Sequence, residues 1–412
     1  MILDNIVSQH AEESAFLWLL RDDAVTAPHY RLDDLIHLES RIDAHLDGLR
    51  VAGKTGWKHC LDQLELQEKG EVFSAAFMAL DSAVEAGLTP VLEVIRAAPE
   101  TTRGVISALG WVERDRLQGH VLGLLQSSEP LRRQVGLSAC AIRRVDCGQH
   151  LKAGVEDEDP QVRARALRSV GEIRRHALRA QLLSHLRDSD EGCRFWAAWS
   201  ACLLGSPEGS DELLRFAAKP SVYQRKALEL LMRNPDHGLS VACLRDLSQQ
   251  QPESREVVEA SGWFGDPASI PWLLEQMKLP PLARRAGEAI SLITGLDLAY
   301  LDLDGETPEG FEAGPTEDPE DEQVALDDDE DLPWPDRQKL LAWWQVHESE
   351  YVPGRRYLCG QPIDTGQCRE VLRTGFQRQR RAAALEWAML EADQALFNTS
   401  DRGERQRAQL AV

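Results

Sequence analysis

The chain has 412 residues, and at roughly 100–200 residues per domain this length predicts two or three domains. Its 46 Lys and Arg residues against 68 Asp and Glu residues give a formal charge of −22. This charge argues against direct binding of nucleic acid or of an anionic membrane, because both need clustered cations. A hydrophobic content of 43% supports an ordinary core and excludes wholesale disorder.

Residues 1–65 are predicted to form a helical N-terminal cap. Amphipathic helices are expected at about 9–21 and 32–49, and a repeat array needs such a cap with a polar outer face. The first residues lack the basic start and the apolar run of a signal peptide, and the chain holds no uncharged apolar stretch of about 18 residues. We therefore expect a cytoplasmic protein without a membrane span.

A repeat of about thirty residues is predicted for 66–298. The segment VRARALRSVG at 162–171 is centred on Ala166, and a second apolar stretch, LRAQLLSHLRD at 178–188, follows it at helical spacing. Because one helix pair cannot bury its own apolar stripe, the pairs are expected to stack into an all-α solenoid of about eight helix-pair repeats with helical caps. The related segments are centred, at intervals of 28 to 31 residues, on Ala76, Ile106, Val135, Ala197, Ala227, Val258 and Ala286.

A proline precedes six of these centres by five to seven residues. We expect each proline to open the first helix of its unit, because the N–H that proline lacks has no partner at that position in any case. The six are Pro99, Pro130, Pro160, Pro220, Pro252 and Pro280.

An arginine stands three residues before five of the centres. We interpret these arginines as structural partners of acidic turns, such as those containing Asp157 or Asp188, and as helix caps. This interpretation is preferred to a ladder of arginines that binds an external anion. The five are Arg103, Arg132, Arg163, Arg194 and Arg255.

Residues 299–335 are predicted to form a mobile acidic loop. Asp302 to Asp331 hold 15 Asp or Glu residues and no Lys or Arg, and dense like charge with little apolar content disfavours a helix pair. The other 382 residues carry only −7. The loop either docks on the chain's own basic C-terminal region or binds a partner. The candidate partner-binding residues at its end are Asp327, Asp328, Asp329, Glu330 and Asp331.

Residues 336–412 are predicted to form a helical C-terminal region. The segment FQRQRRAAALEWAML at 376–390 resembles the repeat, with Arg381 three residues before Ala384, and is interpreted as a degenerate last repeat. Residues 351–412 carry ten Arg against seven acidic residues. This balance supplies the basic region on which the acidic loop is one candidate to dock.

Two resemblances follow from these motifs. The pattern V-R-x-x-A-L after the acidic turn DEDP resembles the HEAT-like repeats of the phycobilisome-lyase type over roughly residues 70–295, which implies an architecture and no particular activity. The segments AEESAFLWLLRD at 11–22, DAHLDGLRVAG at 43–53 and GRRYLCGQPID at 354–364 resemble an uncharacterised proteobacterial HEAT-like family that is often encoded with type VI secretion genes. That resemblance implies a cytosolic protein that meets a secreted effector toxin, and it carries no site residues.

Signatures of catalysis are absent from the sequence. No phosphate-binding loop, dinucleotide fingerprint, G-x-S-x-G elbow or H-E-x-x-H motif occurs, and the eight cysteines include no C-x-x-C pair. We therefore predict no catalytic residue, no cofactor and no metal, and reduced thiols as expected in the cytosol.

The favoured hypothesis is a non-catalytic protein-binding solenoid, an immunity protein that binds and neutralises a type VI effector toxin. Acidity suits a basic partner, and a nuclease is one such toxin. An adaptor or chaperone that loads an effector onto the secretion spike is the second hypothesis. The third is a lyase- or isomerase-type enzyme, which would need a deep apolar pocket with convergent polar groups. Candidate apolar anchors, a role in which tryptophan is enriched, are Trp196, Trp199, Trp263 and Trp272.

Overall fold

The computed structural model describes residues 3–81, 87–311, 313–314 and 326–411. Every predicted repeat centre lies in a helix, and a second helix follows in each unit up to the one that begins with α16. The predicted all-α solenoid of repeat helices is confirmed. The first helices are α4 (Lys69–Asp81), α6 (Thr102–Trp111), α8 (Pro130–Ile142), α10 (Pro160–Glu172), α12 (Glu191–Leu203), α14 (Gln224–Leu231), α16 (Arg255–Phe264) and α18 (Pro280–Thr294).

The second helices are shorter on average, and short 3-10 turns adjoin several of them. They are α5 (Thr89–Ala97), α7 (Arg114–Leu125), α9 (Gln149–Gly154), α11 (Arg179–Ser184), α13 (Pro207–Ala217), α15 (His237–Gln250) and α17 (Ile270–Gln276). The 3-10 turns of the chain are η1 (Leu64–Leu66), η2 (Pro99–Thr101), η3 (His176–Leu178), η4 (His185–Arg187), η5 (Pro267–Ser269) and η6 (Glu348–Glu350).

The chain divides into two compact units. Unit 1 comprises Met1–Thr26, Tyr30–Glu212 and Ala392–Val412, and unit 2 comprises Ala27–His29 and Leu213–Glu391. The predicted C-terminal region is therefore shared between the two units, because its last residues return to unit 1. The finer division at residues 65, 298 and 335 stays a prediction.

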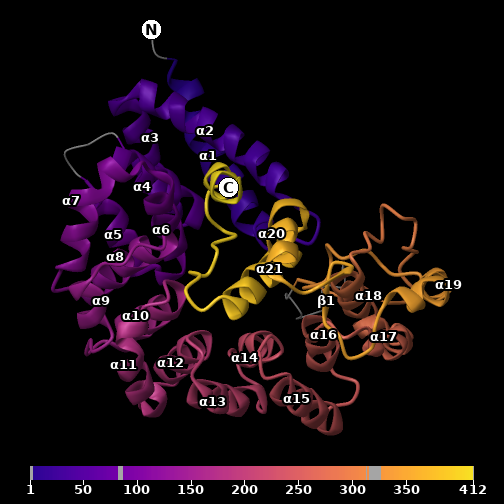
Figure 1. Cartoon of the computed structure of the whole chain (residues 1–412). Coiled ribbons are helices and arrows are strands. Elements are labelled where there is room, and N and C mark those ends of the chain that lie inside the picture. Colours follow the sequence, from indigo (N-terminus) through magenta and orange to yellow (C-terminus); the bar gives the residue numbers. More distant parts are fainter. Residues whose placement is uncertain (1–2, 82–86, 312, 315–325, 412) are drawn as a thin grey trace. The chain divides into compact units, whose positions relative to one another are not determined.

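Unit 1 begins with α1 (Asp4–Ala24), α2 (Leu32–Ala52) and α3 (Lys54–Gln63), and α1 packs against both α2 and α4. The first helices α4 to α12 pack on one another in chain order, while α7, α9 and α11 lie along one side of this layer (Figure 1). Trp18 of α1 stacks on Phe73 of α4 with ring centroids 5.1 Å apart. The N-terminal helices thus close the apolar face of the first repeat.

The C-terminal residues of unit 1 cover the ends of its first helices. Leu396 N donates to Glu172 O at 2.9 Å, and Asn398 Nδ2 donates to Ile142 O at 2.8 Å, so this segment follows the C-terminal ends of α10 and α8. Arg21 is buried, pairs with Glu39 at 2.8 Å and donates to the carbonyl groups of Ser400 and Asp401. The hydrogen bonds from Leu396 and Asn398 satisfy carbonyl groups at helix C-terminal ends, which have no partner within the helix. The segment ends in α22 (Gly403–Leu410).

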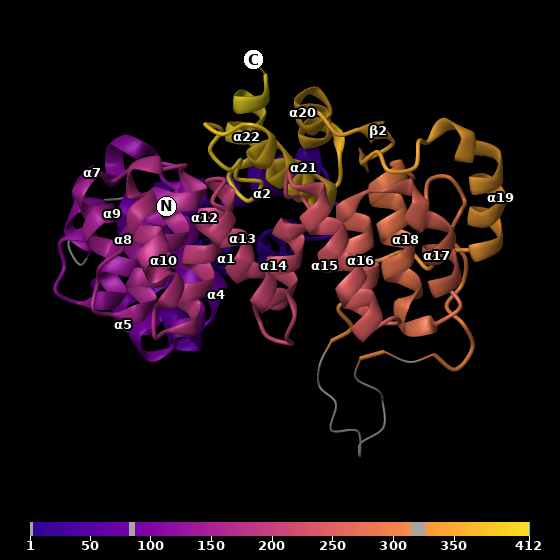
Figure 2. The same cartoon turned by 60° about the horizontal axis from the view of Figure 1, so that its bottom comes forward.

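In unit 2, a C-terminal segment likewise forms hydrogen bonds with the C-terminal ends of first helices. Tyr357 N donates to Gly265 O and Cys359 N donates to Leu292 O, both at 2.8 Å, at the C-terminal ends of α16 and α18. The segment forms the ribbon β1 (Tyr357–Leu358) and β2 (Gln361–Pro362), which pair antiparallel, and Figure 2 shows β2 at one end of these helices. The other helices of unit 2 are α19 (Arg337–His347), α20 (Thr365–Thr374) and α21 (Gln377–Leu390).

The proline expectation is correct for three units and wrong for the other three. Pro130, Pro160 and Pro280 each open a first helix as predicted. Pro99 opens η2, whereas Pro220 and Pro252 lie in turns before α14 and α16. The physical reason is visible at α16, where the side chain of Ser254 accepts a hydrogen bond from Val257 N and so caps the helix two residues after the proline.

Neighbouring first helices approach so closely that some contact positions have no room for a side chain and require glycine. A Cβ added at Gly104 of α6 would lie 2.3 Å from Lys69 O, whereas a Cβ at Gly119 of α7 meets nothing within 4 Å. Within the described residues, no helix is both long and apolar enough to cross a membrane.

We expect Gly104→Ala to lower the free energy of unfolding by about 1–3 kcal/mol, because α4 and α6 must separate to admit the methyl group. Urea denaturation followed by circular dichroism measures the change. The matched control Gly119→Ala should leave stability unchanged or raise it by up to about 1 kcal/mol, since alanine favours a helix over glycine. Equal effects of the two substitutions would contradict the proposed close packing.

Candidate functional site

The repeated arginines contact acidic side chains or carbonyl groups, as expected for structural partners. Arg163 pairs with Asp188 at 2.8 Å, which confirms the predicted use of that acidic turn. Arg194 Nη1 donates to Asp188 O at 2.8 Å from the following unit. Arg103 and Arg132 pair with acidic side chains as well, namely Asp22 and Glu129.

Two turns between units share one geometry, and we call it the Asp-x-Asp turn. In the turn 157–159, Asp157 accepts from the backbone N–H of Asp159 at 3.0 Å and binds Arg133 of the preceding first helix through two contacts of 2.8 Å. In the turn 188–190, Asp188 accepts from Asp190 N at 2.9 Å and binds Arg163. One carboxylate thus holds both its own turn and the helix of the unit before it.

The electrostatics of Asp188 follow from this arrangement. Burial acts to raise the pKa of this carboxyl, but hydrogen bonds from Arg163, from the Asp190 N–H and from His185 outweigh burial and lower the pKa to about 2. The carboxylate is therefore charged in the folded chain at every ordinary pH. A two-contact guanidinium pair of this kind is among the stronger hydrogen-bonded interactions in proteins.

The end of the predicted acidic loop lies on arginines of unit 2. The carboxylate of Asp329, with 4% of the side chain exposed, contacts Arg255 at 2.7 Å and Arg285 at 2.5 Å. Asp327 contacts Arg284 at 2.5 Å. These arginines belong to the repeat helices α16 and α18. For Asp327 and Asp329, the expected docking surface in the basic C-terminal region is thus corrected to the repeat array, whereas Asp302 does pair with Lys339 of α19 at 3.2 Å.

The five predicted acidic residues form two groups, one that contacts arginines and one that faces solvent. Asp327 and Asp329 point toward the arginines, whereas Asp328, Glu330 and Asp331 are exposed. Leu332, directly after them, is buried. Of the predicted mobile loop 299–335, residues 312 and 315–325 lie outside the described residues. Near its base the loop is anchored by pairing of Asp304 with Pro335 and by donation from Gly305 N to Trp334 O at 2.8 Å.

The four predicted tryptophans do not form one cluster. In unit 1, Trp196 and Trp199 of α12 are 5.5 Å apart, and Trp199 is buried while Trp196 is half-buried beneath Arg168 at 4.5 Å. In unit 2, Trp263 is half-buried on the first helix α16, and Trp272 lies on the second helix α17 and packs against the core. Of the four tryptophans, Trp263 is the one that lies next to Arg225.

The sequence analysis did not predict a set of contacting arginines in unit 2, which we call the arginine network. Glu259 is buried and contacts Arg225 at 2.8 Å and Arg285 at 3.4 Å, and Arg225 lies 5.3 Å from the ring centre of Trp263. The contacts therefore connect Trp263 through Arg225, Glu259 and Arg285 to the acidic segment. A second periodic signal was available in the sequence, two residues before the repeat centres, at Arg133, Arg225 and Arg284.

A small cavity adjoins the acidic segment in unit 2. Its volume is about 90 Å³, and its lining includes His29, Glu288, Asp331 and Arg378. Burial raises the pKa of Glu288, although Arg378 lies 2.7 Å away and acts in the opposite direction. Small-molecule sites usually measure roughly 300–1,000 Å³. Among the described residues, no group of three or more metal-binding side chains is placed to hold a metal ion.

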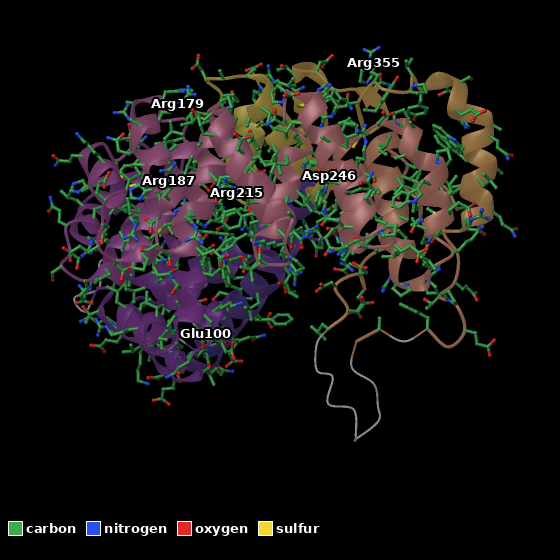
Figure 3. All side chains as sticks on the ribbon, turned by 90° about the horizontal axis from the view of Figure 1, so that it is seen from below. Glu100, Arg179, Arg187, Arg215, Asp246 and Arg355 are labelled. Carbon is green, nitrogen blue, oxygen red and sulfur yellow. The ribbon has the colours of Figure 1, made fainter. Side chains whose placement is uncertain are left out.

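Charged side chains also cover the second-helix side of unit 1. Arg179 of α11 and Arg187 of η4 are exposed, as is Glu100 of η2 (Figure 3). Mixed charges of this kind are typical of a solvated face. The more specific arrangement is the arginine network of unit 2 with its docked acidic segment.

Comparison with known proteins agrees with the helix pairs. Residues 148–233, which run from α9 through α14, match the family model for HEAT repeats. No curated protein gives a significant match. This match supports a HEAT-like repeat protein, and HEAT repeats suggest a scaffold for protein interaction.

The Asp-x-Asp turns make stability depend on pH. The pKa of Asp188 is about 2 in the folded chain and near 3.8 without its partners, so its contribution is complete above about pH 4 and is lost as the pH falls toward 2. We expect Asp188→Asn to cost about 2 kcal/mol at pH 7 and much less near pH 2. Urea midpoints measured from pH 7 to pH 2.5 give this difference.

The control is Asp211→Asn at an exposed position of α13. It removes the same charge, and its effect on the urea midpoint at pH 7 should stay within about 0.5 kcal/mol. A cost for Asp188→Asn that does not shrink at low pH would rule out the proposed ion pair as its cause.

Proposed function

We propose that this chain is a non-catalytic protein-binding solenoid, a cytosolic immunity protein that binds and neutralises a type VI secretion effector toxin. The observation that carries the protein-binding part is the docked acidic segment. Its inward carboxylates are held by arginines, and Asp328, Glu330 and Asp331 are left exposed next to one another. A held segment loses less conformational freedom on binding than a free one, which favours affinity.

The chemistry of the partner follows from this segment. Exposed carboxylates attract a basic surface and accelerate its encounter with the chain. Toxins that act on nucleic acid need such a basic surface, because they bind phosphate. The resemblance to a family encoded with type VI secretion genes supports an effector as the partner. A nuclease effector is the class that this charge fits best.

Trp263 adds an apolar side chain to the arginine network, next to Arg225. It is half-buried, and Arg225, whose side chain is about half exposed, lies over its ring. Tryptophan and arginine are the residue types most enriched at the centres of protein interfaces. Trp263 is therefore the preferred anchor of the four predicted tryptophans, whereas Trp199 and Trp272 contribute to packing.

The lyase or isomerase hypothesis requires a deep apolar pocket. The cavity beside the acidic segment, at about 90 Å³, is smaller than the usual small-molecule site and does not supply that pocket. The adaptor hypothesis shares the protein-binding surface with the immunity hypothesis, and only the consequence of losing the chain distinguishes them.

The direct experiment is expression of a candidate type VI effector from the organism that encodes this chain, with and without the chain, in a susceptible host. Immunity requires that cells survive only when the chain is present and that the two proteins copurify. Copurification without protection, together with loss of effector delivery after deletion of the chain, would instead establish the adaptor function. Absence of any complex between the two proteins would contradict both.

The acidic segment is tested by the triple variant Asp328→Asn, Glu330→Gln and Asp331→Asn. We expect its affinity for the effector to fall at least tenfold in 50 mM salt, because three charges are removed, and to fall less in 500 mM salt, where charge is screened. Isothermal titration at the two salt concentrations measures both effects. The matched control Asp62→Asn, Glu65→Gln and Glu68→Gln removes three exposed charges near η1 of unit 1 and should bind normally.

A further inference from the structure

Arginines of the first helices hold both the Asp-x-Asp turns and the acidic segment. Arg133 and Arg163 are the fourth residues of α8 and α10, and Arg284 is the fifth residue of α18. Arg284 also stands two residues before the centre Ala286, as Arg133 does before Val135. The acidic segment is therefore bound by a surface of arginines from the start of repeat helices, as the Asp-x-Asp turns are.

Inside the array, this surface is filled by the turn that leads to the next unit. Arg133 binds Asp157, 24 residues later, and Arg163 binds Asp188, 25 residues later. The helix α18 is the last first helix of the predicted array, and the chain leaves it at Gly295 in a left-handed conformation. Arg284 instead binds Asp327, 43 residues later.

The segment 327–329 reproduces the turn in sequence and in backbone contacts. Asp327 accepts from Asp329 N at 3.0 Å, the same contact that Asp157 makes with Asp159 N at 3.0 Å. Arg284 Nη1 further donates to Asp329 O at 2.8 Å. In the array, a carbonyl group of the turn accepts from the arginine of the helix that follows, as Asp157 O does from Arg163. The segment thus presents an Asp-x-Asp turn without the helix that normally follows it.

We propose that Arg255, Arg284 and Arg285 form a receptor for an Asp-x-Asp turn, and that the chain fills this receptor with its own residues 327–329. The ligand class is an aspartate-rich peptide strand, recognised by two carboxylates two residues apart and by the carbonyl groups between and beside them. A partner that carries such a strand binds here only by displacing the chain's own segment.

The contacts explain why the receptor is self-occupied. Asp329 is almost fully buried and its carboxylate meets two guanidinium groups, and Arg284 and Asp327 are both mostly buried. Burial acts against the charged form of Asp327, yet the Asp329 N–H and Arg284 hold its pKa below the usual range. Attachment to the same chain adds an effective concentration on the order of millimolar. A free strand therefore competes poorly with the attached one.

The test compares the full chain with the variant Asp327→Asn and Asp329→Asn, which keeps the receptor and weakens its occupant. The probe is a fluorescein-labelled peptide of sequence LDDDEDLP, which is residues 326–333. We expect fluorescence anisotropy to show at least tenfold tighter binding to the variant than to the unchanged chain in 50 mM salt, and binding should weaken at 500 mM salt.

Two controls define the specificity. The variant Asp328→Asn and Glu330→Gln removes the same charge from outward positions, keeps the segment docked and should bind the peptide as poorly as the unchanged chain. A peptide with Asn in place of the first and third Asp should not bind the Asp327→Asn and Asp329→Asn variant. Adding Arg255→Gln and Arg284→Gln to that variant should abolish binding of the original peptide.

Equal binding of the peptide to the unchanged chain and to the variant would overturn the proposal, as would equal binding of the Asn-containing peptide. Far-ultraviolet circular dichroism checks that each variant is folded. If the double variant does not fold, Asp327→Asn alone leaves the contacts of Asp329 in place, and a threefold or larger gain in peptide binding is then expected. No gain in that folded single variant would also reject the receptor.

Discussion

The pairing of an aspartate in a turn with an arginine from the preceding first helix joins successive units in the middle of the array. Apolar burial drives helix pairs together, but it has no direction and does not set the spacing of one pair on the next. The Asp-x-Asp turn sets this spacing, because one carboxylate binds its own backbone and the neighbouring helix at once, as in Asp157 with Arg133. Asp188 and Arg163 repeat the arrangement one unit later.

The same kind of interaction recurs at α18, together with apolar packing. Leu340 and Trp344 of α19 lie in the same buried cluster as Ile290 of α18. Asp327 and Asp329 bind arginines of α18 and α16, and the acidic segment is therefore part of the packed structure at its described end, with Asp328, Glu330 and Asp331 facing solvent. One short segment thus joins a structural role to a surface suited to a basic partner, and the proposed function and the proposed receptor use its two opposite sides.

In both units, a C-terminal segment donates backbone hydrogen bonds to the C-terminal ends of first helices. In unit 1 the residues around Leu396 lie along α8 and α10, and in unit 2 those around Tyr357 lie along α16 and α18. These backbone contacts occupy the carbonyl groups that a bound peptide would otherwise contact. Trp263 of a first helix is instead partly exposed, and Asp328 of the acidic segment is exposed.

Helical periodicity predicts the helix pairs, the repeat length and the centres from Ala76 to Ala286, because this periodicity is a local property that recurs about every thirty residues. The repeat also indicates the structural role of Arg163 with Asp188, since both residues belong to it. Docking of the acidic segment on α16 and α18, and the return of the last residues to unit 1, follow from long-range contacts in the folded chain. Those contacts join residues 43 and 252 positions apart, as in Arg284 with Asp327 and Arg144 with Leu396, and no local pattern specifies which distant surface a segment meets.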